Sequence, residues 1–272
     1  MITSGEIKGL GELLKKHTFV IPDYQRGYEW EAGNISDFHN TLQGLVGSGA
    51  TTFLGTLIIK RDFETAEKVE IVDGQQRITT VFMYLAVLRD LLDELTLKAL
   101  PPAGLSPLGR NPSIVVNALL LDHKMTDYRL LPNDLIRDLF LNHVVASPRA
   151  EDGTPRKRMP KKDKAYTKDF RRAYALIREL LEREVANVAE SEQEKLIIFD
   201  GFLEAISEQL QVLPIFSGDD SEALEIFMTM NTKGLRLAAS DIIKSNIFKG
   251  VLSCASTEQR SVLSQHMGLL KV

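Results

Sequence analysis

The feature that most constrains the fold is a short strand followed almost at once by a long apolar helix. Residues 69–72 alternate apolar and polar side chains, which is typical of a half-buried strand. From Ile78 to Leu95, apolar residues recur at spacings of three and four and so predict one face of a helix. The polar residues 73–77 separate the two elements. This order of elements predicts an α/β unit in the first part of the chain.

Two earlier segments complete the predicted α/β part. Residues 18–21 and 51–59 are rich in apolar and β-branched side chains and read as strands. Because 61–68 is polar, we predict that 51–59 and 69–72 form a hairpin. Residues 100–112 hold four prolines and two glycines, which favours a loop and a boundary between two parts of the chain.

The chain beyond this loop is mostly helical by its apolar spacing. Helices are predicted over 134–145, 168–188, 192–211, 221–230 and 241–252, with a returning strand at 212–216. We therefore predict an α/β (α+β) fold with two domains. The predicted α/β core covers residues 1–98, and the mainly helical region covers residues 99–272.

Composition excludes several classes of protein. With 44% hydrophobic and 26% charged residues, the 272-residue chain is not disordered overall. Its apolar stretches are far shorter than the roughly 18–20 residues that span a bilayer, and its start lacks a secretory signal, so a cytoplasmic protein with no membrane partner is expected. One cysteine and five scattered histidines argue against a zinc centre, and a net charge of −4 argues against a wholly basic nucleic-acid binder.

The junction, residues 73–77, carries the most informative side chains. Gly74 allows a sharp turn, and the first amides of the following helix have no partner within it, so an anion can be held there. Arg77 adds a permanent charge suited to phosphate oxygens. Gln75 and Gln76 supply neutral donors and acceptors for a base, a sugar or an attacking water. Asp73 is the candidate for a magnesium-bound water or a general base.

An ordinary alternative stays open for the junction: Asp73 and Gly74 form a plain capped turn and the glutamines are solvated. The chain contains neither Gly-x-x-x-x-Gly-Lys-Ser/Thr nor Gly-x-Gly-x-x-Gly, so the two familiar phosphate loops are absent.

The aromatic loop, residues 24–30, is a second polar cluster directly after a strand. Tyr24, Tyr28 and Trp30, the only tryptophan, offer stacking faces, and Gln25 and Arg26 repeat the polar pair of the junction. Two such pairs after two strands could face one cleft. The alternative is that the aromatic side chains anchor the loop to the core and the arginine pairs with a local carboxylate.

Two later segments add basic residues. Asn231, Lys233 and Lys244 lie around a predicted helix–turn–helix joint and could bring donors to an anion, although an ordinary joint explains them equally. Residues 147–168 hold eight Lys or Arg against three acids. This stretch reads as a solvated loop or as a contact to nucleic acid through Arg156, Lys157, Arg158, Lys161 and Lys162.

Together these segments resemble the N-terminal domain of GmrSD-type modification-dependent restriction and antiphage proteins, which include SspE and BrxU. The resemblance rests on Ile-Pro-Asp-Tyr-Gln-Arg-Gly-Tyr-Glu-Trp (21–30), Phe-Leu-Gly (53–55), Asp-Gly-Gln-Gln-Arg (73–77), Met-Asn-Thr-Lys-Gly (230–234) and Ser-Asp-Ile-Ile-Lys (240–244), in that order. It spans about residues 5–250. It implies a small ParB/sulfiredoxin-like mixed-sheet core that binds the nucleotide, residues 1–98, and a helical region, residues 99–272, that packs on the core and completes the pocket.

The resemblance also implies a function and a site. The function is binding of an NTP, GTP or another, and its Mg²⁺-dependent hydrolysis to NDP, coupled to sensing of modified double-stranded phage DNA and to control of a nuclease. The implied catalytic residues are Asp73, Gln75, Gln76 and Arg77, with Asp73 also holding Mg²⁺ through water. The implied nucleotide-binding residues are Tyr24, Gln25, Arg26, Trp30, Gly74, Thr79, Asn231, Lys233 and Lys244.

Where many relatives have Leu-Asn-x-Arg-Gly, this chain has Met-Asn-Thr-Lys-Gly, which leaves the role of Lys233 open. The family's histidine-asparagine-histidine nuclease motif is not found, so a separate nuclease domain or subunit is the expected partner, and a homo-oligomer is compatible with the sequence. Two alternatives remain: a module that binds nucleotide or DNA without turnover, and a ParB-like nuclease.

Overall fold

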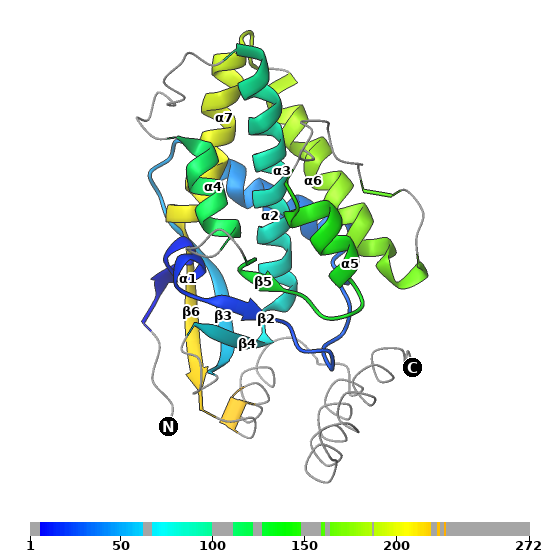
Figure 1. Cartoon of the computed structure of the whole chain (residues 1–272). Helices are drawn as coiled ribbons and strands as arrows, with labels where there is room; N and C mark the ends of the chain where they lie inside the picture. The colour runs from blue at the N-terminus through cyan, green and yellow to red at the C-terminus, as the bar shows by residue number, and fades with distance from the viewer. Residues whose placement is uncertain are drawn as a thin grey trace.

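The computed structural model describes residues 6–61, 67–99, 111–121, 127–147, 159–160, 164–186, 188–218, 222–223 and 226. Within these residues, a six-stranded sheet lies at one end and helices gather over one side of it (Figure 1). The predicted α/β fold class is confirmed.

The sheet is mixed, with strand order β1-β6-β3-β4-β2-β5. β3 runs antiparallel to β4 and parallel to β6, while β2 runs parallel to both of its neighbours, β4 and β5. The strands are β1 (Lys8–Gly9), β2 (Thr18–Val20), β3 (Thr52–Arg61), β4 (Lys68–Asp73), β5 (Leu130–Leu131) and β6 (Leu210–Ser217). The strands predicted at 18–21, 51–59, 69–72 and 212–216 and the hairpin of β3 with β4 are confirmed.

β5 and β6 come from the part of the chain that follows the predicted boundary at residues 98 and 99, and both join the sheet. The division into two domains stays a prediction, and the loop at 100–110 lies outside the described residues.

The described helices are α1 (Leu10–Lys16), α2 (Ala32–Leu45), α3 (Gln75–Ala99), α4 (Pro112–Leu120), α5 (Arg137–Leu139), α6 (Lys168–Ala186) and α7 (Glu192–Glu204). π-helical turns at Phe140–Val145 and Ala205–Gln209 extend α5 and α7, and a short 3₁₀ turn at Ala165–Thr167 precedes α6. The helices predicted from Ile78 and over 134–145, 168–188 and 192–211 are confirmed within a few residues at each end.

Local signals define several helix starts. The Ser191 hydroxyl accepts a hydrogen bond from the amide of Glu194, the Glu194 carboxylate accepts one from the amide of Ser191, and this capping box starts α7. The Asn111 side chain accepts hydrogen bonds from two amides at the start of α4. The first residue of this helix, Pro112, has no amide hydrogen and so leaves no donor without an acceptor. The sequence analysis did not predict α1, α2 and α4, because α1 and α4 are short and two glycines interrupt α2.

Helix α3 is the centre of the hydrophobic core. The side chains from Ile78 to Leu88 are fully buried or nearly so on every face of the helix. α3 packs against α4, α6 and α7 and runs from the sheet into the helical layer, a length of about 37 Å at 1.5 Å per residue. The start of α3 is therefore held rigidly, because the rest of the helix cannot shift without disturbing the core.

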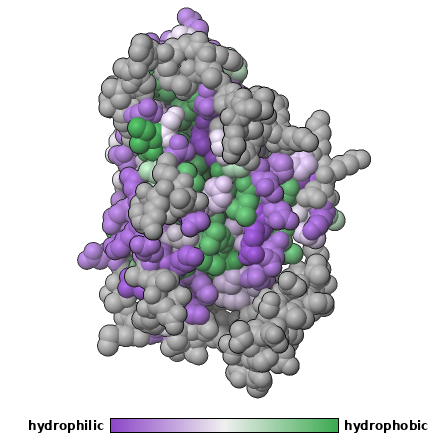
Figure 2. All heavy atoms as spheres, in the orientation of Figure 1, coloured by the Kyte–Doolittle hydropathy of each residue, from purple (hydrophilic) through white to green (hydrophobic). Residues whose placement is uncertain are grey.

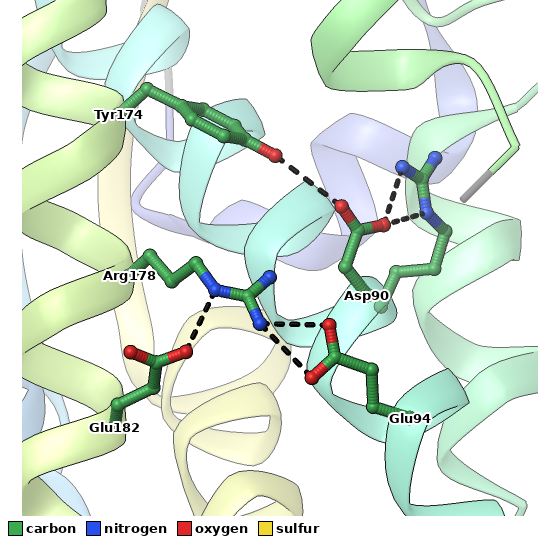
Figure 3. A network of polar contacts seen from close by, with 6 residues as sticks. Asp90, Glu94, Tyr174, Arg178 and Glu182 are labelled. Carbon is green, nitrogen blue, oxygen red and sulfur yellow. Dashed lines mark hydrogen bonds and ion pairs between the residues drawn. The ribbon is translucent and has the colours of Figure 1, made fainter. Parts of the chain in front are cut away.

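A polar network fastens α3 to α6 (Figure 3). On α3, the Asp90 carboxylate accepts hydrogen bonds from Nε and Nη2 of Arg89, at 3.0 and 2.8 Å, and from the Tyr174 hydroxyl of α6 at 3.4 Å. Further along, Nη2 of Arg178 donates to both carboxylate oxygens of Glu94, at 2.7 and 3.0 Å. Burial raises the pKa of Asp90, and Arg89 opposes that rise.

On the face shown in Figure 2, most of the described surface is hydrophilic and the hydrophobic residues gather toward the middle. None of the helices in the described ranges is both long enough and apolar enough to cross a membrane.

Candidate functional site at the start of helix α3

The junction is a tight strand–turn–helix corner. β4 ends at Asp73, Gly74 has a φ of +98°, and α3 begins at Gln75. A Cβ atom at Gly74 would lie 2.3 Å from Cδ2 of Leu57, so only glycine fits both the backbone angle and the space. The amide of Ile78 donates to the carbonyl of Gly74 at 3.1 Å. The amides of residues 75–77 precede this bond and have no acceptor within the helix, which favours an anion at this end.

Arg77 lies behind the corner and is bound to the neighbouring strand. Its Nη2 donates to the carbonyl of Thr56 at 2.7 Å and to Oδ2 of Asp73 at 3.2 Å, and its Nη1 donates to the carbonyl of Leu54 at 3.3 Å. Burial lowers the pKa of Arg77, and the charge of the nearby Asp73 carboxylate opposes that change.

Gly55 makes this position of Arg77 feasible. Its φ is +125°, and a Cβ atom there would lie 2.0 Å from Nη1 of Arg77. The register of β3 against β6 shifts between Phe53 and Gly55, so a β-bulge turns the Leu54 carbonyl toward the guanidinium.

The two glutamines of the junction have different surroundings. Nε2 of Gln76 donates to the carbonyl of Gly27 at 2.9 Å, and its Oε1 accepts from the amide of Glu29 at 3.0 Å. Gln75 is 8% exposed and its carboxamide makes no hydrogen bond to any residue in the described part of the chain. Gln76 therefore holds the aromatic loop, whereas the carboxamide of Gln75 remains available to a ligand or a water.

The aromatic loop lies against the junction, as these contacts show. Nε2 of Gln25 donates to the carbonyl of Val72 at 3.0 Å, directly before the junction. The Tyr28 hydroxyl shares a buried 2.7 Å hydrogen bond with the hydroxyl of Thr80, and burial raises the pKa of Tyr28. The structure thus brings together the two Gln-Arg segments, while the cleft between them stays a prediction.

Other side chains of the loop face solvent or the core. Arg26 is exposed and forms a 2.7 Å ion pair with Glu29. The Trp30 ring packs at 6.1 Å from the ring of Phe38, and Tyr24 is half-buried. Thr79, one turn into α3, is 2% exposed. Arg26 is the one cation in the sequence of this loop, and its exposure makes it accessible to an anionic ligand.

The segment after β5 also contacts this loop, and sequence reasoning missed it. Nδ2 of Asn133 donates to the carbonyls of Gln25 and Arg26 at 3.1 and 3.3 Å. The amide of Asp134 donates to Oδ1 of Asp23 at 2.9 Å. No sequence signal could have found these contacts, because an asparagine more than 100 residues away carries no motif.

Several predicted site residues lie outside the described residues: Arg156, Lys157, Arg158, Lys161, Lys162, Asn231, Lys233 and Lys244. Their roles stay predictions, as do the helix at 241–252 and most of the helix at 221–230, of which the structure describes only residues 222, 223 and 226, all helical.

The donor set at the junction fits a metal ion that arrives with its own phosphate ligands. Asp73 is its one carboxylate, its side chain is 37% exposed, and Mg²⁺ prefers such oxygen ligands while keeping several waters. Nowhere in the ranges that the structure describes do three or more His, Cys, Asp or Glu side chains come together as a metal site.

A mixed sheet with helices on one side defines an α/β domain, and its polar candidate site lies at a strand–glycine–helix corner beside the aromatic loop. The family described as GmrSD restriction endonuclease, N-terminal domain, matches the chain over residues 10–248. The chain belongs to this family and is a domain of a restriction system. No curated protein matches the chain.

Proposed function

We propose that this domain binds and hydrolyses an NTP to NDP and serves as the sensor of a modification-dependent antiphage restriction system. It acts with an HNH-type nuclease domain or subunit and responds to modified double-stranded DNA. The family membership supports the restriction context, and the geometry of the junction supports nucleotide binding.

One observation carries the proposal. After the turn at Gly74, the first three amides of a 25-residue helix have no acceptor within it, and the guanidinium of Arg77 lies at the same corner, bound to Asp73 and to the carbonyl of Thr56. Backbone amides, a helix dipole and a guanidinium together favour phosphate oxygens over neutral ligands.

The environments of the side chains suggest their roles. Gln75 orients the attacking water, since its carboxamide has no partner in the described chain, and Asp73 serves the metal ion or the water. Mg²⁺, when bound, supplies positive charge beside the phosphates. Arg26 leaves its exposed pair with Glu29 to neutralise a phosphate, and Tyr24 and Trp30 supply stacking faces for a base.

The predicted residues that lie outside the described part of the chain also have proposed roles. Asn231, Lys233 and Lys244 add donors to the nucleotide. Arg156, Lys157, Arg158, Lys161 and Lys162 contact DNA.

The test is release of inorganic phosphate when the chain is mixed with each of the four NTPs and Mg²⁺. We expect Gln75→Ala to lower kcat by about 100-fold, because it removes the group that positions water. The matched control is Gln43→Ala, which truncates an exposed glutamine of α2 bound only to Glu184 among described residues. Hydrolysis of none of the four NTPs, or equal rates for the two variants, would overturn the proposal.

A second candidate function is a module that binds nucleotide or DNA without turnover. It is favoured by the Asp73 carboxylate being engaged by Arg77 and by the lack of a second carboxylate in the junction. Titration calorimetry with a non-hydrolysable NTP analogue, and separately with modified and plain DNA, distinguishes the two. Tight binding of the analogue with no phosphate release from the matching NTP supports this second candidate.

A further inference from the structure

The aromatic loop is held at its backbone from two sides. On the α3 side, Gln76 binds the carbonyl of Gly27 and the amide of Glu29. On the other side, Nδ2 of Asn133 binds the two preceding carbonyls, those of Gln25 and Arg26, across sequence separations of 108 and 107 residues. Two side chains thereby bind four polar groups of the loop backbone: three successive carbonyls, those of residues 25–27, and the amide of Glu29.

Asn133 makes its two hydrogen bonds to the loop at an energetic cost. Asn133 is 2% exposed, and its Oδ1 atom is buried without a hydrogen-bond partner among the residues that the structure describes. A buried acceptor without a partner destabilises the fold, and an apolar side chain of similar volume would avoid that part of the cost. What the amide adds is the pair of bonds to the loop.

The two carbonyls belong to Gln25 and Arg26, both of which the family resemblance predicts to bind the nucleotide; the proposed function places Arg26 at a phosphate. Gln25 reaches the carbonyl of Val72 beside the junction, and Arg26 is the exposed cation of the loop. The neighbouring amide of Asp134, bound to Asp23, and Arg137, 3.6 Å from the same carboxylate, hold the residues that lead into the loop.

We propose that Asn133 is a positioning residue of the site, which restrains the backbone of Gln25 and Arg26 so that both side chains are presented to the phosphates. This inference rests on the proposed function. A restrained loop binds its ligand more tightly than a free one, because the entropy of ordering is already lost before binding.

The carbonyl of Arg26 provides a direct readout that needs no nucleotide. Trypsin cleaves after Arg26, and to do so it must take up the carbonyl that Asn133 holds. The rate of cleavage between residues 26 and 27, followed by mass spectrometry on the native full chain, therefore reports the restraint. We expect Asn133→Leu to raise this rate about tenfold, because the loop opens locally more often.

Steady-state kinetics then separate positioning from general damage. Asn133→Leu should raise KM for the NTP about tenfold and change kcat less than about twofold, since the junction itself is untouched. The matched control is Asn117→Leu on α4, the same substitution at a half-buried asparagine whose side chain has no hydrogen bond in the described chain. This control should leave both readouts as in the wild type.

Asn133→Asp provides a variant with the same shape. Its carboxylate cannot donate to the carbonyls at neutral pH, but its protonated form can donate one bond. Cleavage after Arg26 should therefore be faster than in the wild type at pH 8, where this carboxylate is ionised.

An unchanged cleavage rate in folded Asn133→Leu, or faster cleavage with an unchanged KM, overturns the inference. If the wild-type chain neither binds nor hydrolyses any NTP, the proposed function fails and the ligand role of Asn133 fails with it. The cleavage rates in that case still decide whether Asn133 restrains the loop.

Discussion

Replacing Gly55 by alanine tests the link between the β3 bulge and Arg77. The added Cβ would lie 2.0 Å from Nη1 of Arg77 and would require an alanine at a φ of +125°. The backbone strain is about 1–2 kcal/mol. Displacing the guanidinium breaks its bonds to the carbonyls of Leu54 and Thr56, each worth about 1.5–3 kcal/mol for a charged donor. Because Arg77 can regain some water, we expect a total loss of about 3–5 kcal/mol.

The control is Gly47→Ala, at a φ of +69° with no atom within 4 Å of the added Cβ. It carries the backbone strain alone and should cost about 1 kcal/mol. Urea unfolding of both variants, followed by circular dichroism, gives the two free energies of unfolding. If Gly55→Ala costs no more than Gly47→Ala, the bulge does not serve to seat Arg77 and the reasoning is wrong.

Three further predictions concern charge. Burial raises the pKa of Asp90, so the contribution of this group to the free energy of unfolding is complete below the ordinary carboxyl pKa of about 4 and is lost as pH rises through the raised value. The midpoint of urea unfolding should therefore fall over this pH range, and Asp90→Asn should make that fall smaller. Glu29→Gln should release Arg26 from its ion pair and lower KM for the NTP by up to about fivefold in phosphate-release assays. A higher KM would contradict the proposal that Arg26 leaves Glu29 to bind a phosphate. Neutralising the three basic residues 156–158 should reduce the slope of log K for DNA binding against log salt concentration by up to about three. An unchanged slope would indicate that this segment is a solvated loop that does not contact DNA.

Local patterns predicted much of the fold, since the periodicity of a strand or helix lies within the segment itself. The run from residue 69 to Leu95 predicted β4 and α3, because alternation and helical spacing need only neighbouring residues. Strand partners were not predictable in the same way. β6 pairs in parallel with β3 across more than 150 residues, and no local signal states which strand a returning segment will join.

The sequence by itself determined the polar chemistry of the site: a glycine corner, an arginine and two glutamines at a helix start, and an aromatic loop that repeats a Gln-Arg pair. Only the tertiary structure decided how those groups are used. Gln75 and Gln76 are the same residue type at adjacent positions, yet one holds the loop and the other has no partner in the described chain. Asn133 enters the site only because β5 brings it there. Residue type sets which hydrogen bonds a side chain can make, and packing sets which of them it does make.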